Sequence, residues 1–316
     1  MMSVLRLGTR GSALARAQTE WVARRLHAAG IEARAVPVPV AGDGYAALRT
    51  ALVAGEVDVA VHSYKDLPVQ ADPRVVVAAV PERADPRDAL VARDGMVLGE
   101  LPAGAVLGTG SLRRGRQLRA LGLGLQVMPI RGNVDSRISR VLAGECDGVV
   151  IAAAGLTRLG RLAEATELLD PLQMLPAPGQ GALACECRVG DLDTEHLLGT
   201  LLDDAGVRAA VTAERALLAA VGEGCDAAVG ALADVVEDLD DEGRVVLRLF
   251  LRGVAATADD DLLRSSATAP YSAVSDSVGK PTDAEKLGRQ VAVELLDLAA
   301  GALGGRPSAA RPGPPA

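Results

Sequence analysis

Along the first 200 residues, hydrophobic positions switch repeatedly between the two-residue period of a strand and the 3.6-residue period of a helix. Val4–Leu7 alternates in the manner of a strand, and Ser12 is a favourable N-cap for the segment after it. In that segment apolar side chains recur at helical spacing as far as Gly30, which predicts a helix that ends there. The chain therefore opens with a strand followed by an amphipathic helix.

The same alternation of strand and helix continues as far as residue 152. Further strands are expected at Ala35–Val40, Val57–Val61, Val75–Val80, Val106–Leu107, Val127–Ile130 and Gly148–Ala152, and further helices at Ala46–Ala54, from Ser111, and at Asn133–Ala143. Strands that alternate with helices form parallel or mixed sheets covered by helices on both faces. The fold class predicted for this part is α/β.

Two segments resemble crossings between separate lobes. Asp85–Asp88 reads Asp-Pro-Arg-Asp, and Leu175–Gly181 contains two prolines and two glycines. Two short connections between two α/β lobes make a hinged pair with a cleft, which is a usual location for small ligands. We expect residues 1–84 with 182–202 to form the first lobe and residues 85–181 the second.

The pattern changes after about residue 205. A helix is expected at Arg208–Ala220, followed by strands at Val229–Val236 and Arg244–Val254 and a final helix from Asp283 to about Leu298. These elements predict a small α+β domain over 203–305. The remaining tail, 306–316, is rich in Pro, Ala and Gly and is expected to be disordered.

Composition narrows the class of protein. The 316 residues are 49% hydrophobic and 23% charged, which is typical of a soluble globular chain. No apolar run approaches the ~18 residues that span a bilayer, no secretory signal precedes the first strand, and four cysteines do not suggest a disulfide framework. We therefore expect a cytoplasmic protein without a membrane partner.

Arginine is unevenly distributed. Only three of the 33 basic residues are lysines, and eight arginines lie between Thr109 and Arg158 against three acids. Guanidinium groups concentrated in an acidic chain favour a site for carboxylate or phosphate, which arginine binds bidentately, although solvated helix faces would give the same count. A net charge of −8 and 2% aromatic residues argue against nucleic-acid binding.

Two turns are candidate anion cradles. Gly108–Arg114 reads Gly-Thr-Gly-Ser-Leu-Arg-Arg where a strand turns into a helix, so free backbone N–H groups and two hydroxyls gather beside guanidinium groups. It is not a Walker loop, because no Gly-Lys-Ser/Thr follows. Arg131–Asn133 repeats the arrangement at the next junction. Either turn could also be an ordinary capped helix start.

Two further segments carry reactive groups. His62–Pro68 follows a buried strand, where open α/β sheets place their sites, and Asp66 within it could act as a general base or stabilise a developing cation; a helix cap or a surface ion pair is the alternative. Cys225 lies in a glycine-flanked turn suited to covalent chemistry, unless it is an inert thiol. The three histidines lie far apart and no Cys-x-x-Cys occurs, so no metal site is expected.

These segments, taken in order, resemble the porphobilinogen deaminase (hydroxymethylbilane synthase) family over nearly the whole chain to about residue 300. The matching segments are Leu7-Gly-Thr-Arg-Gly-Ser12, Asp58-Val-Ala-Val-His-Ser-Tyr-Lys-Asp-Leu-Pro68, Asp85-Pro-Arg-Asp88, Gly108-Thr-Gly-Ser-Leu-Arg-Arg114, Arg131-Gly-Asn-Val134, Ala153-Ala-Gly-Leu-Thr-Arg-Leu159, Pro178-Gly-Gln-Gly181, Thr212-Ala-Glu-Arg215 and Gly224-Cys225.

The resemblance implies a monomeric three-domain enzyme whose first two lobes are built like a type II periplasmic binding protein. The third domain of the family carries a dipyrromethane cofactor on a cysteine thioether, which would be Cys225. The family condenses four porphobilinogen units, each losing ammonia, into linear hydroxymethylbilane. By match, Asp66 is the catalytic aspartate that stabilises the positive charge left by that loss.

The resemblance also assigns the groups that bind the acetate and propionate side chains. They are Arg10, Ser12, Ser63, Lys65, Thr109, Ser111, Arg113, Arg114, Arg131, Arg137 and Arg158, with Arg188 as a weaker candidate. Arg116, Arg119 and Arg140 have no such match and are expected to be solvated helix residues.

One departure from the family bears on activity. In the family, a mobile, glycine-rich active-site segment follows the position of Gly42-Asp43, and about fifteen of its residues are missing before the helix expected near Ala46. This loss leads us to expect reduced activity and keeps open an alternative, a non-catalytic or degenerate paralogue that binds pyrrole carboxylates.

Overall fold

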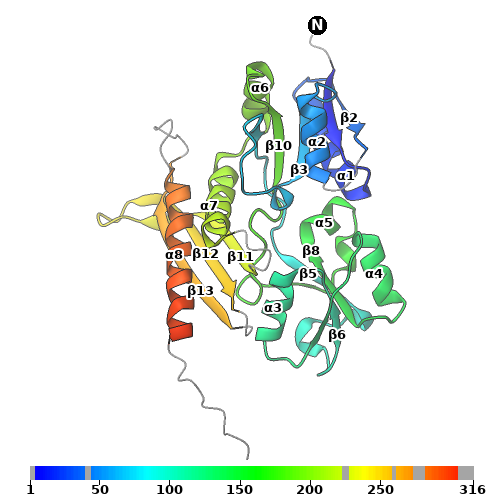
Figure 1. The fold of residues 1–316 in the computed structure, drawn as a ribbon, viewed down its shortest axis with the longest axis vertical. Coiled ribbons are helices and arrows are strands. Elements are labelled where there is room, and N and C mark those ends of the chain that lie inside the picture. Colours follow the sequence, from blue (N-terminus) through cyan, green and yellow to red (C-terminus); the bar gives the residue numbers. More distant parts are fainter. Residues whose placement is uncertain (1–3, 40–43, 223–227, 258–260, 273–281, 305–316) are drawn as a thin grey trace, which may run out of the picture.

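The fold is described from a computed structural model that covers residues 4–39, 44–222, 228–257, 261–272 and 282–304, with side chains described as far as residue 300 (Figure 1). Three sheets organise these residues. The segment 40–43, where the shortened family loop lies, the turn that contains Cys225, and the tail predicted to be disordered lie outside the described residues.

The first sheet, sheet A, has the strand order β2-β1-β3-β10-β4. Strands β1 and β2 are parallel, as are β1 and β3, whereas β10 runs antiparallel to both β3 and β4. Its elements are β1 (Leu5–Thr9), β2 (Ala33–Pro37), β3 (Val59–Ser63), β4 (Val75–Ala79) and β10 (Leu183–Arg188), with helices α1 (Ala13–Ala28), α2 (Gly44–Val53) and α6 (Leu192–Leu202) packed on them.

The second sheet, sheet B, repeats this plan with the order β7-β6-β8-β5-β9. Strand β5 is antiparallel to its neighbours β8 and β9, and the remaining pairs are parallel. Its elements are β5 (Asp88–Ala92), β6 (Val106–Gly108), β7 (Gln126–Met128), β8 (Gly148–Ala152) and β9 (Glu167–Leu168), with helices α3 (Leu112–Ala120), α4 (Val134–Leu142) and α5 (Ala153–Arg158).

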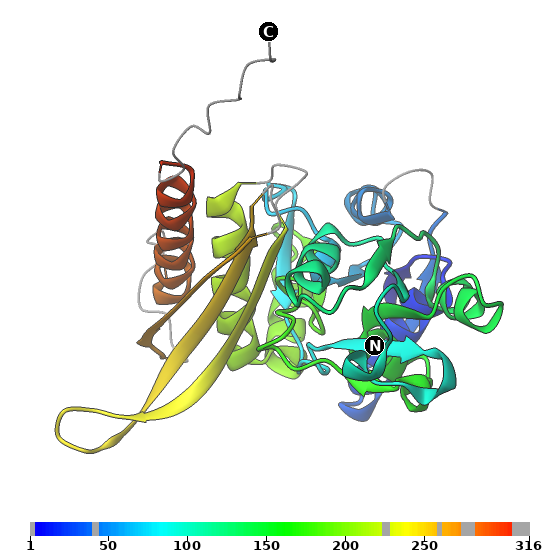
Figure 2. The same cartoon turned by 90° about the horizontal axis from the view of Figure 1, so that it is seen from below.

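The third sheet, sheet C, is an antiparallel meander. Strands β11 (Val229–Leu239), β12 (Val245–Ala256) and β13 (Leu262–Pro270) pair in chain order. Helices α7 (Ala205–Val221) and α8 (Asp283–Gly304) pack on each other and on this sheet. Figure 2 shows the β11–β12 hairpin extending away from the body of the molecule.

The predicted α/β class is confirmed, and the chain crosses between sheets A and B twice, after β4 and after β9. The hydrophobic pattern did not predict β5, β9, β10, β13, α5 or α6. Strand β13 escaped because its burial alternates between half-buried and exposed positions made of small or polar residues, Arg-Ser-Ser-Ala-Thr-Ala, so it has no hydrophobic pattern. Strand β10 escaped because a glutamate, Glu186, interrupts its apolar run although that residue is buried.

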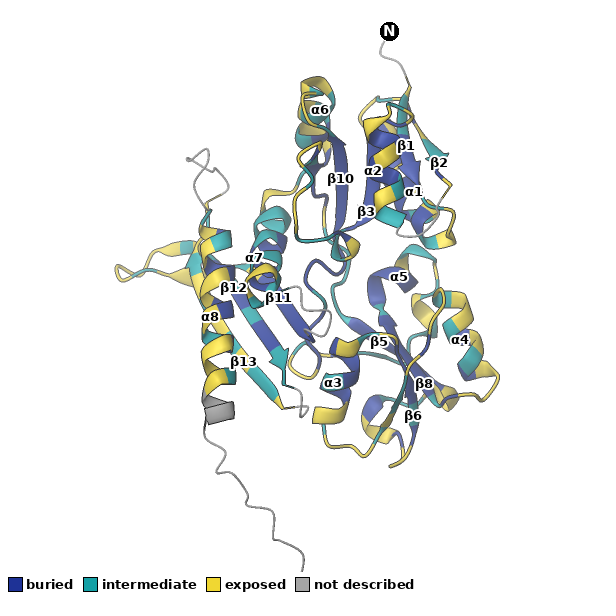
Figure 3. Cartoon of the chain, in the orientation of Figure 1, coloured by how far each residue is buried: buried dark blue, intermediate teal, exposed yellow. Residues whose placement is uncertain are grey.

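The ends of the strands determine where the site lies. In Figure 3 the strands of sheets A and B are largely buried, while the outward faces of their helices are exposed. Strands β1 and β3 end immediately before Arg10 and Tyr64, and β6 and β8 end immediately before Thr109 and Ala153. Carboxyl ends of strands in open α/β sheets are where such folds place their ligands.

Candidate active site

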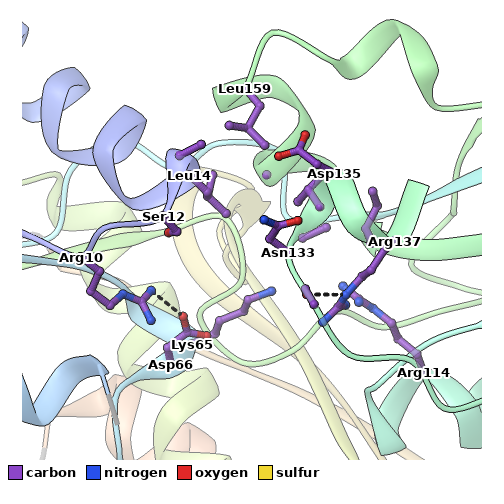
Figure 4. Close-up of a pocket in the computed structure, with 16 residues that line it drawn as sticks. Arg10, Ser12, Leu14, Lys65, Asp66, Arg114, Asn133, Asp135, Arg137 and Leu159 are labelled. Atoms are coloured by element: carbon purple, nitrogen blue, oxygen red, sulfur yellow. Dashed lines mark hydrogen bonds and ion pairs between the residues drawn. The ribbon is translucent and has the colours of Figure 1, made fainter. Parts of the chain in front are cut away.

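A cleft of about 410 Å³ lies where residues that follow strands of sheet A meet those that follow strands of sheet B (Figure 4). Its volume lies within the usual range for small-molecule sites. The charged and polar lining residues are Arg10, Ser12, Lys65, Asp66, Arg114, Asn133, Asp135 and Arg137. A smaller cavity of about 40 Å³ shares part of this lining and adds Gln18, Ser63 and Arg158.

Asp66 is the most accessible carboxylate on the sheet A side of the cleft. It ends the short 3-10 turn Tyr64–Asp66 that directly follows β3, and 43% of its side chain is exposed. Its Oδ2 lies 3.3 Å from Nη2 of Arg10, which follows β1. The structure therefore brings together two residues that lie 56 positions apart in the sequence and that the family resemblance had both assigned to the site.

Lys65 points into the cleft from the other side of the same turn (Figure 4). Its Nζ donates a hydrogen bond to Oε1 of Gln180 at 3.0 Å. Burial, reinforced by the nearby positive charge of Arg114, lowers the pKa of Lys65 to about 8. The ammonium group thus lies where burial and a neighbouring guanidinium group disfavour its positive charge.

Arg113 and Arg114 begin α3 and share one buried acid. Both guanidinium groups contact the carboxylate of Asp88, at 2.8 Å and 2.7 Å, and all three side chains are buried. Burial alone would raise the pKa of Asp88, but the two guanidinium groups outweigh it and hold that pKa well below its usual range. Arg114 also lines the cleft; Arg113 lies behind it and donates to the carbonyl of Leu175.

Arg137 and Arg158 are bound to the chain through backbone carbonyls. Arg137 Nε donates to the oxygen of Gly132 at 2.9 Å, and Arg158 Nη2 donates to the oxygen of Gly181 at 2.6 Å. Burial lowers the pKa of both groups, that of Arg158 to about 10. Like Lys65, these two cations have uncharged oxygens as their hydrogen-bond partners.

This arrangement is suited to a ligand that carries several carboxylates. A buried cation whose charge is disfavoured gains most from an anion that enters beside it, because the anion compensates the lost hydration. Two such cations, Lys65 and Arg137, line the cleft, and a third, Arg158, lines the smaller cavity that shares Lys65 with it. The residues present therefore fit a polycarboxylate better than they fit a neutral or cationic ligand.

Four of the expected carboxylate binders do not line either cavity. Thr109 and Ser111 instead build the turn before α3: Oγ1 of Thr109 accepts from the backbone N–H of Ser111, and the Ser111 hydroxyl caps the helix. Arg113 is paired with Asp88, as described, and Arg131 is exposed in the loop before α4. The weaker candidate Arg188 is bound by Asp191 and by backbone oxygens behind sheet A.

The two predicted cradles exist as capped helix starts that pack against each other. Asn133 caps α4 just as Ser111 caps α3. A Cβ on Gly110 would lie 2.5 Å from the carbonyl oxygen of Ile130, so only glycine permits this approach. Arg119 is exposed, and Arg116 and Arg140 are half-buried; none of the three lines the cleft.

Sequence reasoning missed two glutamines of the site. Gln18, on α1, donates to the Ser63 hydroxyl at 2.8 Å, and Gln180 contacts Lys65. Both are buried. A signal for Gln18 was present, because it interrupts the apolar face of an amphipathic helix, and a buried polar side chain needs a partner.

The remaining cysteines are poor candidates for covalent chemistry. Cys146, Cys185 and Cys187 are all buried, and burial raises the pKa of each thiol, to about 12 for Cys185 and about 11 for Cys187. Such thiols are protonated and unreactive near neutral pH. Cys225, the predicted attachment residue, lies outside the described residues.

Two features are absent from the described ranges, a metal-binding cluster and a membrane-spanning helix. No group of three or more His, Cys, Asp or Glu side chains gathers there in a manner that could hold a metal ion. Within the same ranges, no helix combines the length and apolar character needed to cross a membrane.

The fold and site define a protein of two α/β lobes and a third, antiparallel sheet, with a cationic cleft suited to a polycarboxylate and one accessible carboxylate, Asp66, beside it. The chain belongs to the porphobilinogen deaminase family. The family model "Porphobilinogen deaminase, dipyromethane cofactor binding domain" matches residues 5–196, and "Porphobilinogen deaminase, C-terminal domain" matches residues 208–297.

Curated relatives agree with this assignment. A porphobilinogen deaminase of Mycobacteroides abscessus is 55% identical over 96% of this chain and 100% of its own length. One of Nocardia farcinica is 55% identical over 98% of this chain and 90% of its own length. Among solved structures, a methionine-bound nutrient-binding protein from Burkholderia cenocepacia aligns with 62% of this chain and 90% of its own at 16% identity and a TM-score of 0.42.

Proposed function

We propose that this chain is a transferase that joins four porphobilinogen molecules, with loss of ammonia from each, into linear hydroxymethylbilane. The observation that supports this most directly is a cleft that holds both an accessible carboxylate, Asp66, and the cations Lys65 and Arg137 with uncharged partners. Lys65 also lines the smaller adjoining cavity, together with Arg158, whose partner is a backbone oxygen. Family membership supplies the substrate class, since the relatives are named porphobilinogen deaminases.

The cations have a direct task in this chemistry. Each porphobilinogen carries an acetate and a propionate, so a growing pyrrole chain accumulates carboxylates. Lys65, Arg114 and Arg137 point into the cleft from both sheets (Figure 4). They can bind those carboxylates, fix the orientation of the pyrrole rings and lower the entropy cost of bringing two rings together.

Asp66 is proposed to act on the charge that develops during the reaction. When ammonia leaves a substrate unit, the remaining pyrrole is cationic, and a carboxylate held near the pyrrole N–H stabilises that charge. Arg10, 3.3 Å away, keeps the carboxylate oriented in the cleft. Because Asp66 is partly exposed, it can face successive substrate units without movement of the sheets.

A dipyrromethane cofactor fits the residues present. The described cations that would hold its four carboxyl groups are Lys65, Arg114, Arg137 and Arg158, with the hydroxyls of Ser12 and Ser63 beside them. When bound, it supplies the terminal pyrrole carbon to which the first unit is joined. Attachment is proposed at Cys225, and the three buried thiols are consistent with that choice.

The other assigned groups are proposed to act around this centre. Arg131, exposed beside the cleft, would meet carboxylates of a longer product, while Thr109, Ser111 and Arg113 would shape the wall that holds Arg114. We further propose a cytoplasmic monomer divided into residues 1–84 with 182–202, 85–181 and 203–305.

A turnover assay with a matched pair of variants tests the proposal. Asp66→Asn keeps the shape of the side chain and removes its charge, so porphobilinogen consumption should fall at least about a hundredfold. Glu82→Gln is the control, because Glu82 also lies 3.3 Å from an arginine, Arg25, but on the outer surface. Hydroxymethylbilane should be the product released by the natural chain. Near-normal turnover by Asp66→Asn would assign the chemistry to another group.

A further inference from the structure

Gln180 occupies the junction between the two sheets and is completely buried. It lies in the second crossing segment, Leu175–Gly181, and its side chain reaches the first crossing segment by donating Nε2 to the carbonyl of Pro86 at 2.8 Å. The same Nε2 lies 2.7 Å from Oδ1 of Asp88. The side chain of Gln180 thus links the second connection of the hinge, in which it lies, to the first.

The oxygen of that amide faces the opposite way, toward the cations of the cleft. Oε1 of Gln180 accepts from Nζ of Lys65 at 3.0 Å and lies 3.5 Å from Nη2 of Arg114. Lys65 follows a strand of sheet A, and Arg114 begins a helix of sheet B. A single oxygen therefore contacts a cation from each sheet. The amide cannot be flipped, because its N–H groups would then face the donors of Lys65 and Arg114.

We propose that Gln180 is a positioning residue that holds Lys65 and Arg114 side by side across the hinge, so that one carboxylate of a pyrrole ligand binds both sheets at once. This inference rests on the proposed function for the identity of the ligand. It assigns a role to a residue that touches no substrate and acts through the two cations.

The positioning role of Gln180 can be measured through the pKa of Lys65, which depends on the charges and hydrogen bonds around it. Arg114 and Arg113 disfavour its positive charge, whereas Asp66 and Asp88 favour it. The hydrogen bond from the ammonium to Gln180 also favours the charged form. Removing that acceptor should lower the pKa of Lys65 further, and replacing it with a carboxylate should raise it.

Chemical labelling of lysines measures the pKa of Lys65 without requiring that the protein turn over substrate. The chain has three lysines, Lys65, Lys280 and Lys286, so trace acetylation with acetic anhydride, followed by peptide mass spectrometry, reports Lys65 alone. The full chain bearing Cys225→Ser is used, after its mass confirms that no group is attached. The exposed Lys286 serves as the internal reference in each sample.

Two variants should shift the titration in opposite directions. In Gln180→Met the midpoint falls below about 8, so for a shift of one pKa unit the reactive, unprotonated fraction of Lys65 at pH 7 rises about fivefold and Lys65 reacts faster by that factor. In Gln180→Glu the midpoint rises, and for an equal shift the reaction slows about ninefold. Unfolding would raise the midpoint toward that of a free lysine, so the downward shift in Gln180→Met cannot come from loss of structure.

The control is a second buried glutamine with a structural task alone. Gln117 donates to the carbonyl of Leu175 and accepts from its N–H, at 3.0 Å and 2.8 Å. Gln117→Met should lower the melting temperature yet leave the Lys65 titration unchanged. An unshifted Lys65 midpoint in both Gln180 variants would overturn the inference while leaving the proposed function intact.

Discussion

Lys65 and Asp66 are neighbours in the sequence, yet their surroundings give them different properties. Asp66 is accessible and lies beside Arg10, whereas Lys65 is half-buried near Arg114 and has a pKa of about 8. The sequence could place both residues at the end of a buried strand, because strand ends are readable from the hydrophobic pattern. It could not show which of them would be desolvated, since that depends on Arg114 and Gln180, more than 45 residues away.

The depressed pKa of Lys65 predicts a pH dependence. Below about pH 8 the ammonium is charged and can bind a substrate carboxylate; as the pH rises through 8, that interaction is lost. We expect kcat/KM, which reports the free enzyme, to fall about tenfold between pH 7 and pH 9.

Lys65→Arg separates this effect from other titrations. A guanidinium remains charged across the same interval, so the variant should show a much flatter profile over pH 7–9, whatever its absolute rate. A wild-type profile that is already flat in this interval would contradict the assignment of the alkaline limb to Lys65.

Among the secondary-structure elements, α3 and the start of α4 supply half of the charged and polar residues that line the cleft. The sequence predicted both helices, with a capped start as the alternative to an anion cradle at each, and the structure confirms both helices and shows the caps. What local pattern could not show is that the two capped turns lie against each other through Gly110 and Ile130. That contact joins segments 20 residues apart, so the local pattern carries no sign of it. The carboxylate-binding roles of Thr109, Ser111, Arg113 and Arg131 stay predictions.

Gly110→Ala tests this packing. The new Cβ would lie 2.5 Å from a backbone oxygen, which cannot move away as a flexible side chain could. We expect the free energy of unfolding to fall by about 1–3 kcal/mol, the usual cost of overpacking, as measured by denaturant unfolding. Gly99→Ala, whose Cβ would meet no atom within 4 Å, is the matched control. Equal stability of the two variants would mean that the turns are not in close contact.

In the whole molecule, the three sheets are joined by buried charges. Glu214 of α7 accepts from both terminal nitrogens of Arg83, at 2.7 Å and 3.0 Å, and from the backbone N–H groups of Gly179 and Ala233. It therefore connects the first two sheets to the third. Thr212–Arg215 matches a family motif, but the sequence indicates no partner for its glutamate, because pairs so distant in the chain leave no local signal.

The shortened family loop gives a prediction at this same scale. Inserting a segment of family length between Gly42 and Ala46 should raise the turnover rate or lengthen the released product, because a lid excludes water and retains partly built chains. Single-turnover reactions with mass detection of enzyme–substrate species compare the two proteins. Four additions completed equally fast by both would show that the missing residues are dispensable.

The central claim is that this chain carries a dipyrromethane on Cys225 and extends it in the cleft. The intact mass of the protein, purified after expression with porphobilinogen available, tests this most directly. We expect a mass above that of the chain by one dipyrromethane unit, an excess that Cys225→Ser abolishes and that substitution of Cys146, Cys185 or Cys187 leaves in place. A natural protein with the mass of the bare chain, or an excess that survives Cys225→Ser, would contradict it.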